Sequence, residues 1–113
     1  MSRPTLRPSR VLRIMRAGGV AKCVKLNLAD PAVARIAGQA GFDCVWLDLE
    51  HVPNTLRDIE RSILAATIED CDVLVRVSRG SYSEYIRPLE LDATGIMVPH
   101  VLTGEDARQI AQQ

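Results

Sequence analysis

The stretch 45-VWLDLEHVPN-54 places ionisable side chains at the end of an apolar run. Asp48, Glu50 and His51 follow residues typical of a buried strand, and a proline closes the segment. Ionised groups are costly away from water unless they are paired, hydrogen-bonded or bound to metal. The group therefore indicates either a strand end that meets solvent or a chemical site.

The chemistry open to these residues is proton transfer beside an anion-binding group. An acid three residues before a histidine, as Asp48 is before His51, can accept its ring N–H and make the other nitrogen a better general base. Arg76, near the end of a later apolar run, presents a planar fork that pairs with a carboxylate or an oxyanion. Arg79 and His100 follow apolar runs as well. We expect His100 to line its loop without a chemical role.

The elements that must position these side chains alternate between strands and helices. Asp30-Pro31 is typical of a helix opening, with an aspartate cap and a proline that needs no donor. Gly41 marks the end of that helix, and Asn54 or Thr55 can cap the next. The predicted strands cover 23–28, 43–49, 72–77 and 95–101, and the predicted helices cover 10–17, 31–40, 54–70, 82–91 and 103–113.

Four such repeats predict an α/β fold with about four parallel strands. The pattern fits half of a (β/α)₈ barrel or a small doubly wound domain, and in both the ligand site lies at the carboxyl ends of the strands. The polar residues that end the apolar runs gather there. Each alone could be a solvated strand-end residue, but for Asp48, His51 and Arg76 together we favour a functional site.

Composition excludes several classes of function. The formal charge is zero and aromatic residues are few, which speaks against a nucleic-acid partner. No apolar run approaches the roughly 18 residues that span a bilayer, so no membrane partner is expected. The three cysteines lack ligand spacing, and we expect them to be reduced core thiols in a cytoplasmic protein. A phosphate fingerprint, which a doubly wound anion-binding domain needs, is absent from the sequence.

The amino-terminal region is basic. Seven Lys or Arg side chains precede the first acid, Asp30. Such an arm can be a transit peptide, an anion-binding tail or the solvated face of a helix. We favour the solvated helix face, because apolar residues recur between the arginines at helical spacing. Residues 1–8 are expected to form a flexible basic tail, and 1–113 a single incomplete domain.

Three segments carry a resemblance to a known family. They are 41-GFDCVWLDLEHVPN-54, 73-VLVRV-77 and 89-LELDATGIMVPHV-101, and they resemble the HpcH/HpaI aldolases, the 2-oxo-acid or 2-keto-3-deoxy sugar acid aldolases related to citrate lyase. The resemblance covers nearly all of this chain but at most the front half of a family member. It implies the amino-terminal half of a (β/α)₈ barrel and a metal-dependent lyase of the class II aldolase type. The implied reaction cleaves a 4-hydroxy-2-oxo acid to pyruvate, or a related 2-oxo acid, and an aldehyde.

Residue roles carry over from the matching positions. His51 matches the family's general base, and Arg76 the arginine that stabilises the enolate and its carboxylate. Asp48 matches the acid beside the base. Glu90 stands where many members have an aspartate that makes the histidine more basic, and its longer side chain puts that contact in doubt.

The resemblance also implies a divalent cation, Mg, Mn or Co, held by a glutamate and an aspartate from the second half of the barrel. Those ligands are expected to be absent from this chain, which is therefore expected to be a fragment or an incomplete gene product with little or no aldolase activity of its own. A homo-oligomer is implied for the full-length protein. The alternative from another class is a non-catalytic fragment that acts as an assembly or interaction module through its exposed sheet edges.

Overall fold

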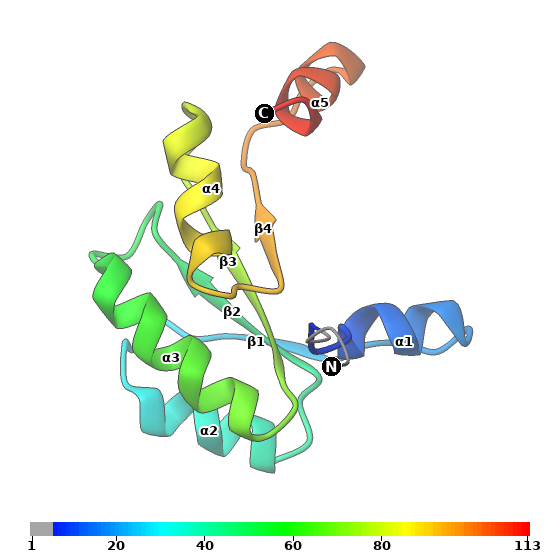
Figure 1. Cartoon of the computed structure of the whole chain (residues 1–113), viewed down its shortest axis with the longest axis vertical. Helices are drawn as coiled ribbons and strands as arrows, with labels where there is room; N and C mark the ends of the chain where they lie inside the picture. The colour runs from blue at the N-terminus through cyan, green and yellow to red at the C-terminus, as the bar shows by residue number, and fades with distance from the viewer. Residues whose placement is uncertain (1–5) are drawn as a thin grey trace, which may run out of the picture.

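A single parallel sheet organises the chain, whose computed structural model describes residues 6–113 (Figure 1). Its strand order follows the chain order, β1-β2-β3-β4, and all three pairings are parallel. The strands are β1 (Cys23–Lys25), β2 (Cys44–Asp48), β3 (Asp72–Arg76) and β4 (Gly95–Met97). A doubly wound sheet reverses its strand order part-way, whereas a barrel adds each strand beside the last. The sequential order therefore agrees with the barrel and not with the doubly wound alternative.

Local capping signals set the starts of the helices. Asp30 accepts a hydrogen bond from the backbone of Ala32, with Pro31 as the first helical residue, and Thr55 and Thr103 each open a helix through a reciprocal capping box. Among residues 6–113, no helix combines the length and apolar character needed to cross a membrane. The helices are α1 (Arg10–Arg16), α2 (Pro31–Gln39), α3 (Leu56–Ile68), α4 (Tyr82–Glu90) and α5 (Gly104–Ala111).

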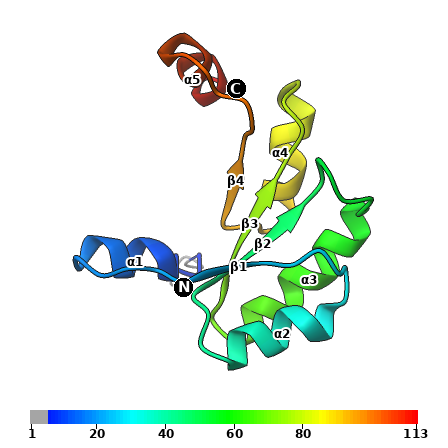
Figure 2. The ribbon, with the colours of Figure 1, turned by 180° about the vertical axis from the view of Figure 1, so that it is seen from behind.

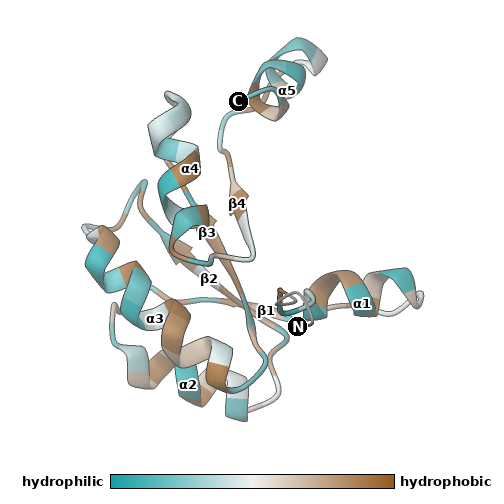
Figure 3. Ribbon diagram, viewed as in Figure 1, coloured by the Kyte–Doolittle hydropathy of each residue, from teal (hydrophilic) through white to brown (hydrophobic). Residues whose placement is uncertain are grey.

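The hydrophobic core lies between the sheet and the helices α2, α3 and α4. Strand alternation sends Val45, Leu47, Val73 and Val75 to this face, where they meet Ile59 and other apolar residues of the helices. Figures 1 and 2 show α2 and α3 together on one side of the sheet, and Figure 3 shows hydrophobic residues along β2 and β3. We call this the helix face of the sheet, and the opposite side the open face.

The open face carries fewer apolar and more polar residues. Trp46 and Leu74 are only partly buried there, although they occupy the middle of β2 and β3. Helix α1 and the segment after it lie against the lower part of this face, where Met15 and Val20 help to line a hollow that also includes Cys23. Cys23 is exposed, so the prediction of three core thiols was wrong: it holds for the other two cysteines only.

Ion pairs hold the amino-terminal segment to the starts of β2 and β3. The buried carboxylate of Asp72 accepts hydrogen bonds from Arg7 (2.7 Å), the Ser9 hydroxyl (2.6 Å) and two backbone N–H groups of α1. Arg10 donates to Asp43 (2.8 Å). The predicted basic tail 1–8 thus includes an anchored residue, Arg7, while 1–5 lie outside the described residues. Arg10 and Arg13 of α1 pair with Asp43 and Asp70 of the same chain and are not merely solvated.

The predicted elements are all present, with shorter strands than the sequence suggests. The apolar runs 23–28 and 95–101 supply strands of only three residues each. In helix α3, Ile63 is buried, whereas the next residue, Leu64, is 64% exposed. Adjacent helical positions diverge by about 100°, so only Ile63 of the two faces the sheet.

Gly38 allows α2 and α3 to approach closely. A Cβ at this position would lie 2.6 Å from Cβ of Glu69. We expect Gly38→Ala to lower the free energy of unfolding by about 1–3 kcal/mol, because the two backbones must separate. Gly104→Ala is the matched control, since a Cβ there meets no atom within 4 Å. Urea titrations give both values, and equal midpoints for the two variants would contradict the close packing of the two helices.

Asp72 is expected to make the stability depend on pH. Burial alone would raise the pKa of its carboxyl, but hydrogen bonds from Ser9, Arg7 and two backbone N–H groups outweigh it and hold the pKa below its usual value of 3.8. A carboxyl whose pKa is lower when folded contributes stability above its unfolded pKa and loses it as the pH falls. The free energy of unfolding should therefore decrease below about pH 4, and less steeply in Asp72→Asn. Denaturant titrations at several pH values test this, and identical slopes would refute it.

Candidate active site at the carboxyl edge of the sheet

Six ionisable side chains gather where β1, β2, β3 and β4 end. We call them the carboxyl-edge cluster. Ion-pair distances of 3.5 Å or less connect all of them. The members are Lys25, Asp48, Glu50, His51, Arg76 and His100.

Asp48, the last residue of β2, holds the cluster to the sheet. Its side chain is fully buried, and Arg76 of β3 donates to both carboxylate oxygens, with Nε 3.1 Å from Oδ1. Lys25 of β1 lies 3.1 Å from Oδ2. The two strand-end residues, Asp48 and Arg76, are also register partners, so the sheet itself aligns this pair. One carboxylate thereby joins three neighbouring strands.

The same carboxylate shapes the loop that carries the histidine. The backbone N–H groups of Glu50 and His51 donate to Asp48 Oδ1 at 2.9 and 3.2 Å, and the Asn54 side chain donates to the Asp48 carbonyl. The hydrogen bond from Arg76 contributes most to lowering the pKa of Asp48, which lies far below its usual range although burial opposes the shift. Asp48 is therefore an anion at neutral pH that orients both Arg76 and the start of the loop.

Glu50 is the acid that meets the imidazoles. Its side chain is only 11% exposed. Oε2 lies 3.5 Å from Nε2 of His51 and 3.2 Å from Nε of Arg76, and Oε1 lies 3.3 Å from Nε2 of His100. The buried Oε2 has no hydrogen bond of good geometry within the described chain. It is thus a buried acceptor close to two cation-forming groups.

Trp46 lies between the two cations of the open face. Nζ of Lys25 and Cζ of Arg76 are each 5.1 Å from the centre of its ring. Such contacts with the face of an indole are favourable, so Trp46 helps to fix both cations next to Asp48. The described contacts of Arg76 use Nε and Nη2, which leaves Nη1 available to a ligand.

Arg79 connects the next loop to the cluster. It donates to the backbone carbonyl of His100 at 2.7 Å and to Asp106 of α5 at 2.5 Å, and it is the main reason that the pKa of Asp106 falls to about 2. His100 itself adopts a left-handed backbone conformation, with φ of 57°. Non-glycine residues adopt it rarely and often at functional sites. Arg79 thus has a positioning task, since it fixes the loop that brings His100 to Glu50.

The described residues do not form a complete metal site. No group of three or more His, Cys, Asp or Glu side chains within residues 6–113 is placed to hold a metal ion. Glu50 is flanked by two histidines and an arginine, and the guanidinium disfavours a cation at that position. The expected glutamate and aspartate ligands from a second half of the barrel remain a prediction.

A comparison with family models assigns the chain. The model described as HpcH/HpaI aldolase/citrate lyase matches residues 24–113. The chain belongs to this family. The matched range includes every member of the carboxyl-edge cluster, so the cluster lies within the family domain and not in an added segment.

Individual relatives agree with this assignment. A hydroxypyruvate/pyruvate aldolase of Roseobacter denitrificans is 34% identical over 87 residues, which are 77% of this chain and 34% of the relative. A 2-keto-3-deoxy-L-rhamnonate aldolase of Shigella sonnei is 31% identical over 97 residues, 86% of this chain and 36% of the relative. The chain therefore spans about a third of the length of these curated relatives.

A solved structure confirms the arrangement of the elements. The crystal structure of an HpcH/HpaI aldolase from Desulfitobacterium hafniense DCB-2 matches with a TM-score of 0.82 at 31% identity. The match covers 88% of this chain and 39% of that chain. The four parallel strands with their helices thus correspond to part of an HpcH/HpaI aldolase barrel, as the sequence predicted.

The cluster differs from the sequence prediction in its contacts. The structure brings His51, Asp48 and Arg76 to one edge of the sheet. The described acidic contact of the His51 ring is with Glu50, because the Asp48 carboxylate pairs with Arg76 and Lys25. His100, expected to line its loop, reaches Glu50 as well. The sequence analysis also missed Lys25, although a lysine in the apolar run 23–28 was a visible signal.

Glu90, the fourth predicted catalytic residue, is not brought to the cluster. It is exposed at the carboxyl end of α4, and no described contact joins it to His51. The shallow hollow beside it is lined by Leu56, Arg57, Glu60, Arg87 and Leu91 as well. A catalytic role for Glu90 in the HpcH/HpaI fold stays a prediction.

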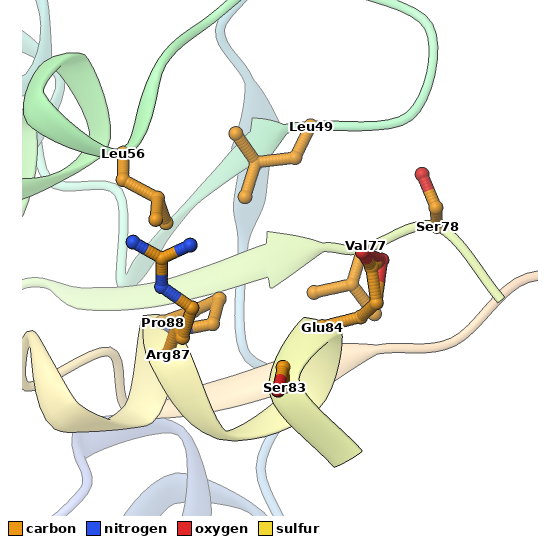
Figure 4. A pocket seen from close by; sticks show the side chains of 8 residues that line it. All are labelled: Leu49, Leu56, Val77, Ser78, Ser83, Glu84, Arg87 and Pro88. Atoms are coloured by element: carbon orange, nitrogen blue, oxygen red, sulfur yellow. The ribbon is translucent and has the colours of Figure 1, made fainter. Parts of the chain in front are cut away.

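A separate hollow lies on the helix face near the same edge. Figure 4 shows Leu49 and Leu56 pointing toward Arg87 across its opening. Its volume is about 200 Å³, and none of its lining residues belongs to the carboxyl-edge cluster. Small-molecule sites usually exceed about 300 Å³. The hollow is therefore small for a substrate site.

Removing the charge of Asp48 should weaken the fold. Asp48→Asn is expected to lower the free energy of unfolding by about 1–3 kcal/mol, because Arg76 and Lys25 lose their shared anion in a mostly buried position. Glu60→Gln is the matched control, since Glu60 pairs with Arg57 on the exposed surface of α3 and should change the value by less than about 0.5 kcal/mol. Chemical denaturation measures both, and a neutral Asp48→Asn would contradict the anchoring role.

Proposed function

We propose that the chain forms the amino-terminal part of a metal-dependent carbon–carbon lyase that cleaves a 4-hydroxy-2-oxo acid to pyruvate, or a related 2-oxo acid, and an aldehyde. The observation that carries the proposal is the convergence of His51 and Arg76 on Glu50 at the carboxyl edge of the sheet. The names of the relatives support the substrate class, because those proteins are aldolases of 2-oxo acids.

Cleavage requires that a proton leave the 4-hydroxyl group while the bond between carbons 3 and 4 breaks. The hydroxyl oxygen then becomes the aldehyde oxygen, and the bonding electrons pass to carbon 3 and the 2-oxo oxygen as an enolate. A nitrogen of His51 is suited to take the proton, because the imidazole is 65% exposed at the edge, where a substrate can reach it. Glu50, whose Oε2 lies 3.5 Å from Nε2 of His51, is suited to orient the imidazole.

Arg76 is suited to hold the other end of the substrate. Asp48 and Trp46 fix the guanidinium, and Nη1 remains available for the carboxylate or the enolate oxygen. A fixed positive group is most effective where charge develops during the reaction, because it needs no reorganisation. A divalent cation, Mg, Mn or Co, would supply further positive charge at the 2-oxo oxygen. The described residues do not complete a site for that cation, so the part proposed for this chain is proton transfer and substrate orientation by its own side chains.

A chimera tests these roles directly. Residues 1–113 would replace the matching third of the Roseobacter denitrificans aldolase, and pyruvate release from a 4-hydroxy-2-oxo acid would be measured with added Mg, Mn or Co. We expect turnover by the chimera and a loss of about 10²–10⁴-fold in kcat on His51→Ala, because proton transfer is removed. Arg76→Ala should lower kcat/KM through both binding and enolate stabilisation.

The matched control is a second variant of the same chimera. Glu60→Gln, on the exposed side of α3, should leave kcat unchanged. If His51→Ala reduced turnover only in proportion to lost metal content, His51 would be a ligand and not the base. The isolated chain should show no turnover, because its sheet is open and its histidines lie in water; robust turnover by it would refute that expectation.

The open sheet edges favour a second candidate function, an assembly module. Within the described chain, β1 and β4 each pair on one side only, and the residues of β4 are half-buried. Unpaired strand edges readily pair with other chains. The coding sequence downstream distinguishes the two: a continuous reading frame that encodes the missing barrel strands supports the lyase, whereas its absence supports the module.

A further inference from the structure

Two cysteines face each other at the lower end of the open face. Cys23 of β1 and Cys44 of β2 are register partners, so their side chains leave the sheet on the same side. Both line the hollow beneath α1. Cys44 is fully buried and Cys23 is exposed, so one thiol of the pair can meet a solute.

The spacing of the two strands suits a disulfide bond. Neighbouring strands lie about 4.7–4.9 Å apart, and disulfides join Cα atoms about 4.4–6.8 Å apart. The Cβ atoms must come within about 4.5 Å, so one strand must be able to adjust its position slightly. Strand β1 can do so, because it has three residues and pairs within the described chain only with β2.

We propose that Cys23 and Cys44 form an oxidation-sensitive pair, which hydrogen peroxide converts into a disulfide that joins β1 to β2. The proposal is independent of the lyase reaction. It adds a modification site at the opposite end of the open face from the carboxyl-edge cluster.

The reaction balances with the peroxide as the only oxidant. The sulfur of Cys23 attacks a peroxide oxygen, the O–O bond breaks, and water leaves as the sulfenic acid forms. The sulfur of Cys44 then attacks Sγ of Cys23, and the S–O bond breaks with release of a second water. Two thiols lose two protons and two electrons, and one hydrogen peroxide is reduced to two waters. Burial raises the pKa of the Cys23 thiol, so oxidation should be slow near neutral pH.

The third cysteine cannot join this pair, because its side chain points to the other face of the sheet. Cys71 is next to Asp72, the register partner of Cys44, and alternation turns it to the helix face. Its Cβ lies 3.4 Å from the position that a Cβ on Gly38 of α2 would occupy. Cys71 therefore packs against α2, on the other side of the sheet from the pair, and supplies a natural control.

The bond would fix the strand that carries Lys25. That residue follows Cys23 by two positions in β1 and points to the open face, where it contacts Asp48 and Trp46. Oxidation would thus hold a member of the carboxyl-edge cluster at its place through a covalent link at the base of the same strand.

The 113-residue chain itself serves for the test. Purified reduced protein is exposed to hydrogen peroxide, quenched by alkylation, digested and analysed by mass spectrometry. We expect a monomer that has lost two hydrogen atoms, one of its three titratable thiols remaining, and a peptide that links Cys23 to Cys44. Because this mapping uses the wild-type chain, it does not depend on whether a cysteine variant folds.

Variants separate the pair from general oxidation. Cys71→Ser should oxidise as the wild type does, while Cys23→Ser and Cys44→Ser should form no intramolecular bond. Protein oxidised in concentrated urea shows the mixture of disulfide pairings that an unfolded chain gives. A linked peptide that contains Cys71, a Cys23–Cys23 link between two chains, or sulfinic acid without any disulfide would overturn the proposal.

Discussion

The buried carboxylate of Asp48 is the interaction on which the candidate site depends. It takes charge-assisted hydrogen bonds from β3, an ion pair from β1 and backbone donors from the loop that carries His51. An unpaired buried charge is costly, whereas a carboxylate with several donors is stable as the anion. One side chain therefore fixes the mutual positions of the groups that the proposed reaction needs.

A buried carboxylate also organises the opposite end of the same strands. Asp72, buried at the start of β3, gathers Arg7, Ser9 and the first backbone N–H groups of α1. β2 and β3 thus bind the amino-terminal segment at their starts and hold the carboxyl-edge cluster at their ends. The interior between these two ends is apolar on the helix face, and on the open face it contains the partly buried Trp46 and Leu74. The rigid central strands explain how a short parallel sheet can position charged groups at both of its edges.

Local signals predicted most elements, while contacts distant in sequence were harder to foresee. Asp30-Pro31 and Thr55 act within one helical turn, so the sequence alone located those helix starts. The exposure of Cys23 depends on how much of the open face α1 covers, which no short pattern encodes. The partner of the His51 ring depends on competition for Asp48 from Arg76, 28 positions away. Sequence reasoning placed Asp48, His51 and Arg76 at one edge of the sheet but could not assign which acid each base would meet.

The strand order has a consequence for how the chain is made. Each strand pairs with the one synthesised just before it, so β1 to β3 can align as they emerge from the ribosome, in the direction of translation. Helix α1 cannot dock in the same stepwise order, because Arg7 and Asp72 are 65 positions apart. Helix α1 therefore cannot complete its docking until the third strand has left the exit tunnel. Its apolar residues Leu12 and Met15, 47% and 59% exposed even in the folded chain, are then available to chaperones during that interval.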